Sequence, residues 1–155
     1  MASLRRLLRR WRSDEGAQLV EFALVLPLLL FVVLAIAEFG FIFQRYEVIT
    51  NAAREGARMA VLPGYGDNGV ITSRVTAYVA AGRVPATGTN PAVLVETVSI
   101  PVGGGLPAVS ARRVTVTYTH TYMFIPNIGA WFGATYTTIP LVAVSEMRTE
   151  IIAGS

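Results

Sequence analysis

Two residues near the N-terminus have types and a spacing that could support processing and assembly. Gly16 ends a charged segment, and Glu21 lies five residues later inside an apolar run. A carboxylate near the start of a membrane helix is energetically costly, so it indicates a functional role. If the chain is cut after Gly16, Ala17 gains a free amine. Glu21 then lies about one helical turn away, near the positive end of the helix dipole, and can neutralise this amine or that of a neighbouring subunit.

Composition removes most other kinds of chemistry. The chain has no cysteine, which excludes disulfides, thiol catalysis and iron–sulfur clusters, and its single histidine, His120, cannot build a multi-histidine metal site. The glycine run at 103–105 has no lysine beside it, so it is a turn rather than a phosphate loop. Nothing points to a carboxylate pair among the later acids, which are Asp67, Glu96, Glu146 and Glu150. We expect no catalytic residue, metal, cofactor or small-molecule substrate, and His120 is interpreted as structural.

The net charge is concentrated at the N-terminus. All thirteen basic residues are arginines, and residues 1–16 hold five of them together with two acids. Residues 17–155 hold eight arginines and eight acids, so this larger part has no net charge. A nucleic-acid-binding domain would spread its basic charge over a folded surface, so no nucleic acid is expected as a partner. A short basic segment before an apolar run is instead typical of a topology signal that keeps the N-terminus in the cytoplasm.

The apolar run is long enough to cross a membrane. Residues 22–37 contain no charged residue, although 15% of the whole chain is charged. A bilayer core of about 30 Å needs about 20 helical residues, which residues 17–43 supply. Pro27 lies inside this run, where we expect it to kink the helix. The predicted organisation is a basic cytoplasmic leader (1–16), a transmembrane helix (17–43), an extracytoplasmic continuation of this helix (44–62) and an extracytoplasmic domain (63–155).

The continuation of the helix has a small side and a polar side. Nothing before Pro63 and Gly64 breaks it, so one helix is predicted over residues 17–62. Small residues at helical spacing are expected to pack on the protein's own sheet. They are Ala52, Ala53, Gly56, Ala57 and Ala60. The polar side holds Arg54, Glu55 and Arg58, which are either subunit contacts or a solvated face with ordinary ion pairs.

The rest of the chain predicts a short helix and a small sheet. Asp67 or Asn68 can cap a helix over residues 70–81, and Gly82 can end it. Its predicted buried stripe is Ile71, Val75, Tyr78 and Val79. Branched and alternating residues then predict strands over 92–100, 112–124 and 137–149. The expected fold class is α+β, with the short helix and the long helix packed on a small antiparallel sheet.

Several motifs together resemble a known family. A glycine before an apolar run, with glutamate at the fifth following position, resembles the processing site of type IV prepilins. The run GAQLVEFALVLPLLLFVVLAIAEFG, followed by the block NAAREGAR at residues 51–58, is similar to the TadE-like family. This family comprises minor pilins or pseudopilins of the tight-adherence (Tad/Flp) pilus system. The resemblance covers residues 16–58 and includes the pair Glu21-Phe22, Pro27 and the EFG motif at 38–40. Residues 146–150 also resemble the family's C-terminal strand.

The resemblance implies a pilin-like fold, a processing step and a set of partners. A membrane prepilin peptidase would cut between Gly16 and Ala17, and Glu21, beside Phe22, would contact an N-terminal amine and fix the register of the subunits. The implied partners are the membrane, the peptidase, the Tad pilus subunits and their assembly platform. The implied location is the bacterial cytoplasmic (inner) membrane, as a single-pass protein with the C-terminal domain outside the cytoplasm, or a pilus. The implied role is assembly or priming of a pilus for surface adherence, without catalysis.

Other interpretations of the N-terminus remain open. Residues 35–37 have the small-x-small form of a signal-peptidase site, and cleavage there would release a domain that begins at Glu38. The pair Arg5-Arg6 partly fits a twin-arginine signal. An uncleaved anchor would give the same topology as the prepilin interpretation. The rival function is then a membrane-anchored extracytoplasmic binding or adhesion domain that acts through residues 122–136, and a hydrolase is a third alternative.

Two further features have alternative interpretations at this point. Glu38 is either an acid that contacts a basic group of another subunit or a hydrated residue at the outer membrane interface. The aromatic segment 122–136 is either an exposed binding loop or the closure of one end of the core.

Overall fold

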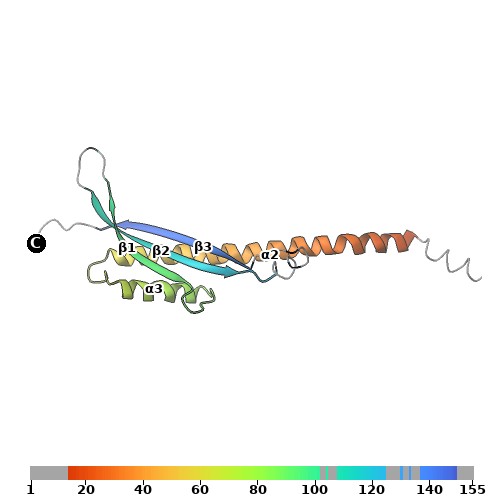
Figure 1. Ribbon diagram of the computed structural model, residues 1–155, viewed down its shortest axis with the longest axis horizontal. Coiled ribbons are helices and arrows are strands. Elements are labelled where there is room, and N and C mark those ends of the chain that lie inside the picture. The colour runs from red at the N-terminus through yellow and green to blue at the C-terminus, as the bar shows by residue number, and fades with distance from the viewer. Residues whose placement is uncertain are drawn as a thin grey trace, which may run out of the picture. The chain divides into compact units, whose positions relative to one another are not determined.

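The structure is a computed structural model that describes residues 14–101, 104, 108–124, 130, 133 and 137–149. The elements follow the order α2 (Asp14–Ala60), α3 (Asn68–Ala81), β1 (Ala92–Ile100), β2 (Val109–Thr121) and β3 (Thr138–Arg148) (Figure 1). The chain divides into two compact units, Met1–Phe39 and Gly40–Ser155. The second unit contains the last part of α2 together with α3 and the sheet. These elements confirm the expected α+β class.

Helix α2 is a single element of 47 residues, as the sequence predicts, but it begins at Asp14 rather than at Ala17. Gly16 does not prevent the earlier start, because a glycine inside a helix costs only about 1 kcal/mol relative to alanine. The helical assignment continues on both sides of Pro27. The helix ends at Ala60, shortly before Pro63 and Gly64, where the turn to α3 begins.

Helix α3 has a side-chain cap at its N-terminus and a backbone cap at its C-terminus. The Asp67 carboxylate accepts hydrogen bonds from the backbone N–H groups of Gly69 (2.9 Å) and Val70 (3.1 Å), which is the N-cap expected from the sequence. Gly82 ends the helix, also as expected. The positive φ of 56° falls on Arg83, and the N–H of Val84 bonds the carbonyl of Val79, which is the Schellman pattern. A residue with a side chain therefore holds the conformation that usually selects glycine.

The sheet has three antiparallel strands in the order β1-β2-β3. β2 is central and pairs Thr115 with Leu94 of β1 and with Val144 of β3. The predicted strand over 112–124 is displaced, since β2 both begins and ends three residues earlier. The alternation is as expected, because Val114, Val116 and Tyr118 are buried while the threonines between them are more exposed. One face of the sheet therefore contributes to the core.

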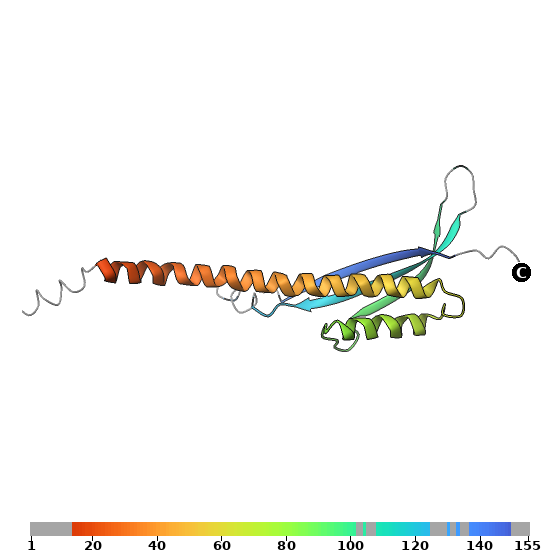
Figure 2. The same cartoon turned by 180° about the vertical axis from the view of Figure 1, so that it is seen from behind.

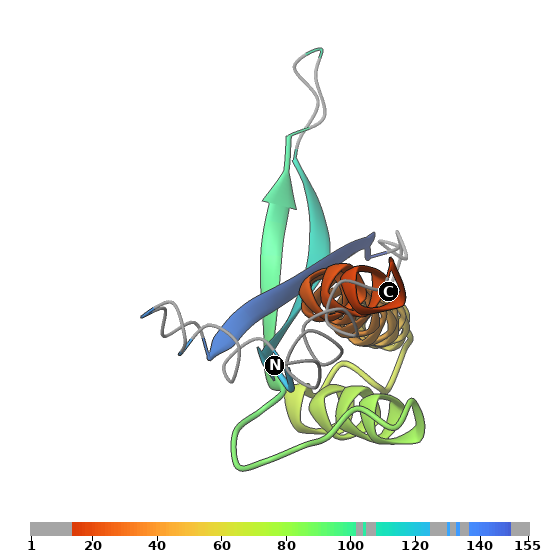
Figure 3. The ribbon, with the colours of Figure 1, turned by 90° about the vertical axis from the view of Figure 1, so that its right-hand side faces the viewer.

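The core of the second unit lies where α2, α3 and the sheet meet. Figure 2 shows α3 running beside the last part of α2, and Figure 3 shows α3 and the sheet on different sides of that part. The predicted small-residue stripe of α2 is buried, which confirms its packing role. A Cβ atom added to Gly56 would lie 2.6 Å from Val75 Cγ2 and 3.2 Å from Val114 Cγ1. The three elements therefore approach one another closely at Gly56.

One predicted core position of α3 is wrong. Ile71, Val75 and Val79 are fully buried, but Tyr78 keeps 38% of its surface exposed. Tyr78 instead lines an open groove of about 280 Å³ with Val48, Asn51, Ala81 and Gly82. At about 100° per residue, the stripe of residues 71, 75 and 79 is centred on Val75 and faces the core, while position 78 lies about 60° to one side of that centre.

A half-buried arginine ties the turn before α3 to the sheet. Arg112 of β2 donates from Nη2 to Asn68 Oδ1 (2.6 Å) and to the carbonyl of Gly66 (3.2 Å), and from Nη1 to Thr97 Oγ1 (2.9 Å). The planar guanidinium group can hold these separate acceptors at once because its donors are arranged as a rigid fork. This contact fixes the beginning of α3 against β1 and β2.

Candidate functional site

The first unit presents apolar side chains to its surroundings. Along the part of α2 before Gly40, large apolar residues are exposed, with exposed fractions of 75% for Leu24, 57% for Leu29 and 67% for Ile36. Within the described residues, α2 is long and apolar enough to cross a membrane. A helix that is apolar nearly all round requires an apolar environment. The basic residues of the leader, 5–12, lie outside the described residues.

The predicted processing and register residues lie at the beginning of α2. Gly16 and Ala17 belong to the first turn, and Glu21 and Phe22 are exposed one turn later. Residues four apart on a helix have Cβ atoms about 5–6 Å apart, so Ala17 and Glu21 lie on the same face. The geometry therefore places the Glu21 carboxylate within reach of a charge at position 17.

Glu38 differs from the other predicted site residues because it is fully buried. Burial of the carboxylate favours a contact with a polar or basic group over simple hydration. A contact between Glu38 and another subunit stays a prediction.

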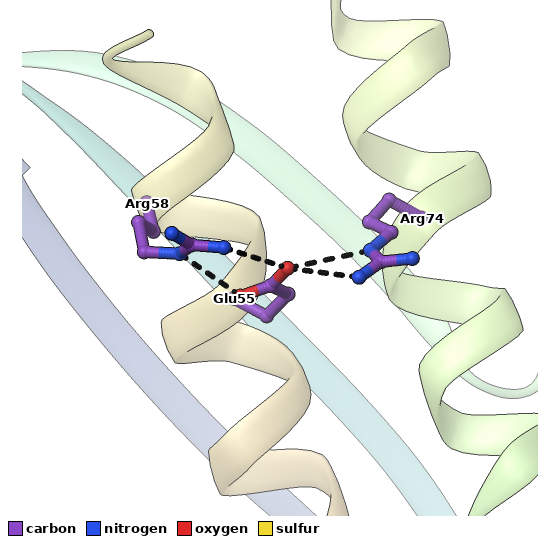
Figure 4. Close-up of polar contacts among 3 residues, drawn as sticks. All are labelled: Glu55, Arg58 and Arg74. Atoms are coloured by element: carbon purple, nitrogen blue, oxygen red, sulfur yellow. Dashed lines mark hydrogen bonds and ion pairs between the residues drawn. The ribbon is translucent and has the colours of Figure 1, made fainter.

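The polar side of α2 in the second unit contains an ion-pair cluster. Glu55 accepts hydrogen bonds from Arg58 Nε (3.1 Å) and from Arg74 Nη2 of α3 (3.1 Å), as Figure 4 shows. The Glu55 side chain is 17% exposed, whereas those of Arg58 and Arg74 are 62% and 53% exposed. Hydrogen bonds from Arg58 and then from Arg74 lower the pKa of Glu55, and the bond to Glu55 raises the pKa of Arg58. The cluster joins α2 to α3, and Arg54 is exposed beside it.

The sequence pattern indicates Glu55 and Arg58 as members of this cluster but does not indicate Arg74. These two residues of α2 are three positions apart, a spacing that predicts contact on one helix. Arg74 is 19 residues from Glu55 and reaches it only because the chain reverses between α2 and α3. The short Pro-Gly turn after α2 was the available signal, because such a turn makes consecutive helices antiparallel neighbours.

A second cluster surrounds His120, which is fully buried. Its Nδ1 is in hydrogen-bond contact with Nη1 of Arg45, and its ring meets the Tyr122 ring edge-on at 5.5 Å. The Arg45 guanidinium also lies 5.9 Å from the centre of the Tyr118 ring. Because these contacts join α2 to β2, His120 has the structural role that the sequence suggests. Among the described residues, no three His, Asp or Glu side chains gather where they could hold a metal ion.

Comparison with known proteins gives one match. The family model described as TadE-like protein matches residues 16–58. No curated protein and no solved structure matches the chain. The matched segment contains the exposed apolar part of α2 and the block at residues 51–58 that packs at Gly56. It also contains the predicted processing and register residues, which are Gly16, Ala17, Glu21 and Phe22. The apolar helix and this match fit a membrane protein related to the Tad pilus. Residues 16–58 are thus TadE-like, which confirms the family resemblance inferred from the sequence.

Proposed function

We propose that this protein is a TadE-like minor pilin or pseudopilin that acts in the assembly or priming of a Tad/Flp-type pilus used for surface adherence. One observation carries the proposal. The TadE-like match over residues 16–58 coincides with a helix whose apolar side chains are uncovered before Gly40 and buried against α3 and the sheet after it. Such a helix can be held by lipid first and by the helices of other subunits later. Its role is structural assembly and not catalysis.

Processing sets the N-terminus in this proposal. The basic leader keeps the N-terminus in the cytoplasm, and the prepilin peptidase cuts between Gly16 and Ala17. The cut replaces the first turn of α2 with a free amine at Ala17. The Glu21 carboxylate, four residues further along the same helix face, then pairs with this amine or with that of a neighbouring subunit. An ion pair in an apolar environment is strongly preferred over either charge alone, so it selects one axial register.

The location follows from the same elements. Residues 17–43 cross the cytoplasmic (inner) membrane, and the extracytoplasmic domain carries α3 and the sheet. The assembly platform withdraws the apolar helix from the bilayer and packs it beside the helices of the other Tad pilus subunits. Withdrawal requires a replacement apolar surface, because the exposed leucine and phenylalanine side chains before Gly40 would otherwise meet water.

The Glu21→Ala substitution tests this role. The variant should insert into the membrane and be processed as the unmodified protein is, because removing a carboxylate does not weaken an apolar segment. It should be lost from sheared pilus fractions, because the amine then has no partner. Glu96→Ala, which removes an exposed acid of β1, is the matched control. Incorporation of Glu21→Ala at the control's level would contradict the role assigned to Glu21.

A further inference from the structure

An outward stripe of α2 carries opposite charges two helical turns apart. Glu47, Arg54 and Arg58 are exposed, and the last two follow Glu47 by seven and eleven residues. At about 100° per residue, both arginines fall within about 20° of the direction of Glu47. The three side chains therefore form a narrow stripe along the helix, which we call the charged stripe. All three belong to the second unit.

The charges of this stripe are not balanced within one chain. Glu55 is shared by Arg58 and Arg74, so one carboxylate serves two guanidinium groups. In the described part of the chain, neither Glu47 nor Arg54 forms an ion pair. Arg54 and Arg58 are also four residues apart, a spacing at which like charges repel on a helix. The stripe therefore presents a free acid at one end and surplus positive charge at the other.

We propose that the charged stripe binds the charged stripe of a second copy of this chain that is displaced by two helical turns along the axis. This inference rests on the proposed function, which makes neighbouring helices parallel. A displacement of seven residues, about 10 Å along the axis, brings Glu47 of the raised copy level with Arg54 of the lower one. Asn51 of the raised copy comes level with Arg58.

Charge complementarity selects this register over the alternatives. Two copies at the same height would oppose Glu47 to Glu47 and Arg54 to Arg54, which places like charges together. A displacement of three turns would bring Glu47 to Arg58, but this guanidinium already bonds Glu55. Arg54 is the cation of the stripe without such a bond. The contact joins different residues of the two copies, so one copy keeps a free Glu47 and the other a free Arg54. Further copies can bind at these free residues, and the assembly extends along the axis instead of closing as a dimer.

Cross-linking in the membrane tests the register directly. The chain has no cysteine, so introduced thiols are its only ones. Copies with Phe43→Cys and copies with Thr50→Cys are produced together in the full chain, which keeps every charge of the stripe. After oxidation, the mixed 43–50 product should exceed the 43–43 product by about fivefold, the scale expected for exposed ion pairs. A predominant 43–43 product would overturn the proposal, and so would the absence of any cross-linked dimer, which would mean that another protein covers the stripe.

A charge exchange separates the ion pair from general packing. Glu47→Arg or Arg54→Glu alone should lower the 43–50 product severalfold, and the two together should restore it, because the opposite charges then meet again in the same register. Glu96→Arg, an exposed change on β1, is the control and should have no effect. Failure of the double variant to restore the product would overturn the pairing.

The N-terminal residue of the same samples separates this inference from the proposed function. A chain that begins at Ala17 and gives the 43–43 product would contradict only the stripe contact. A chain that keeps its leader and still gives the 43–50 product would support the contact and contradict the processing on which the proposed function depends.

Discussion

Replacement of Gly56 by alanine should destabilise the second unit, although alanine is the better helix former. On helix propensity alone, Gly56→Ala would stabilise α2 by about 1 kcal/mol. The added Cβ would, however, lie 2.6 Å from Val75 Cγ2 and 3.2 Å from Val114 Cγ1, both on buried side chains. Valine has few alternative rotamers, so these atoms can move away only if the elements shift.

The magnitude follows from the two opposing effects. Overpacking of a filled core costs typically about 1–3 kcal/mol, which exceeds the gain in helix propensity. We expect a net loss of about 1 kcal/mol, which corresponds to a decrease in Tm of about 4 °C for a unit of this size. Gly40→Ala is the matched control, because its Cβ would meet no atom within 4 Å and it should gain stability slightly.

Thermal unfolding of the detergent-solubilised full chain, followed by circular dichroism, measures these shifts. A second substitution identifies the cause. Val75→Ala removes the Cγ2 atom, so Val75→Ala and Gly56→Ala together should cost less than the sum of the two single losses. A Tm for Gly56→Ala that rises as in Gly40→Ala, or strictly additive losses in the double variant, would refute the close approach of the three elements at Gly56.

Four further predictions follow from individual contacts. Arg83→Gly should raise Tm, because glycine adopts the positive φ of 56° without the cost of about 1 kcal/mol that a side chain adds, and an unchanged Tm would argue against this backbone conformation. Glu55→Gln should flatten the acid side of the curve of stability against pH. The pKa of Glu55 is lowered in the folded protein, so its carboxylate stabilises the fold above the unfolded pKa, and this stability is lost as the pH falls through the folded pKa. The free energies of unfolding of the variant and the unmodified protein should therefore converge in acid. Arg112→Lys should lower the stability by about 1 kcal/mol, measured by thermal unfolding, because an ammonium group cannot hold Asn68 Oδ1 and Thr97 Oγ1 together. Leu29→Arg should decrease the carbonate-resistant membrane fraction, since a charge at the membrane centre costs about 3 kcal/mol, whereas Leu29→Phe should leave it unchanged.

Much of the helical part could be predicted from residue types. The small residues of α2 indicated close packing, and Asp67 indicated the beginning of α3, because both signals act within a few residues of the chain. The ion pair of Glu55 with Arg74 could not be read from spacing, since it depends on the angle at which two helices meet. The packing angle also decides which positions of α3 face the core. The sequence pattern therefore placed Tyr78 in the buried stripe, although it lies at the edge of that stripe and is partly exposed.

The ends of elements were less predictable because tertiary contacts decide them. Gly82 ends α3 as expected, but the positive φ lies at Arg83. Gly82 is instead required because a Cβ there would lie 2.5 Å from Val48 Cγ1 of α2. Of the candidate site, the sequence indicated the order of Gly16, Ala17, Glu21 and Phe22 along one helix, but it did not indicate that Glu38 is buried.

The N-terminus of the protein extracted from membranes shows whether the chain is processed as a prepilin. Intact mass and N-terminal sequence are determined for cells with and without the prepilin peptidase. Processing of the prepilin type predicts a chain that begins at Ala17 when the peptidase is present and keeps residues 1–16 when it is absent. A chain that keeps its leader in both strains, or one that begins at Glu38, would contradict the pilin-type pathway and favour an anchored or a secreted domain instead.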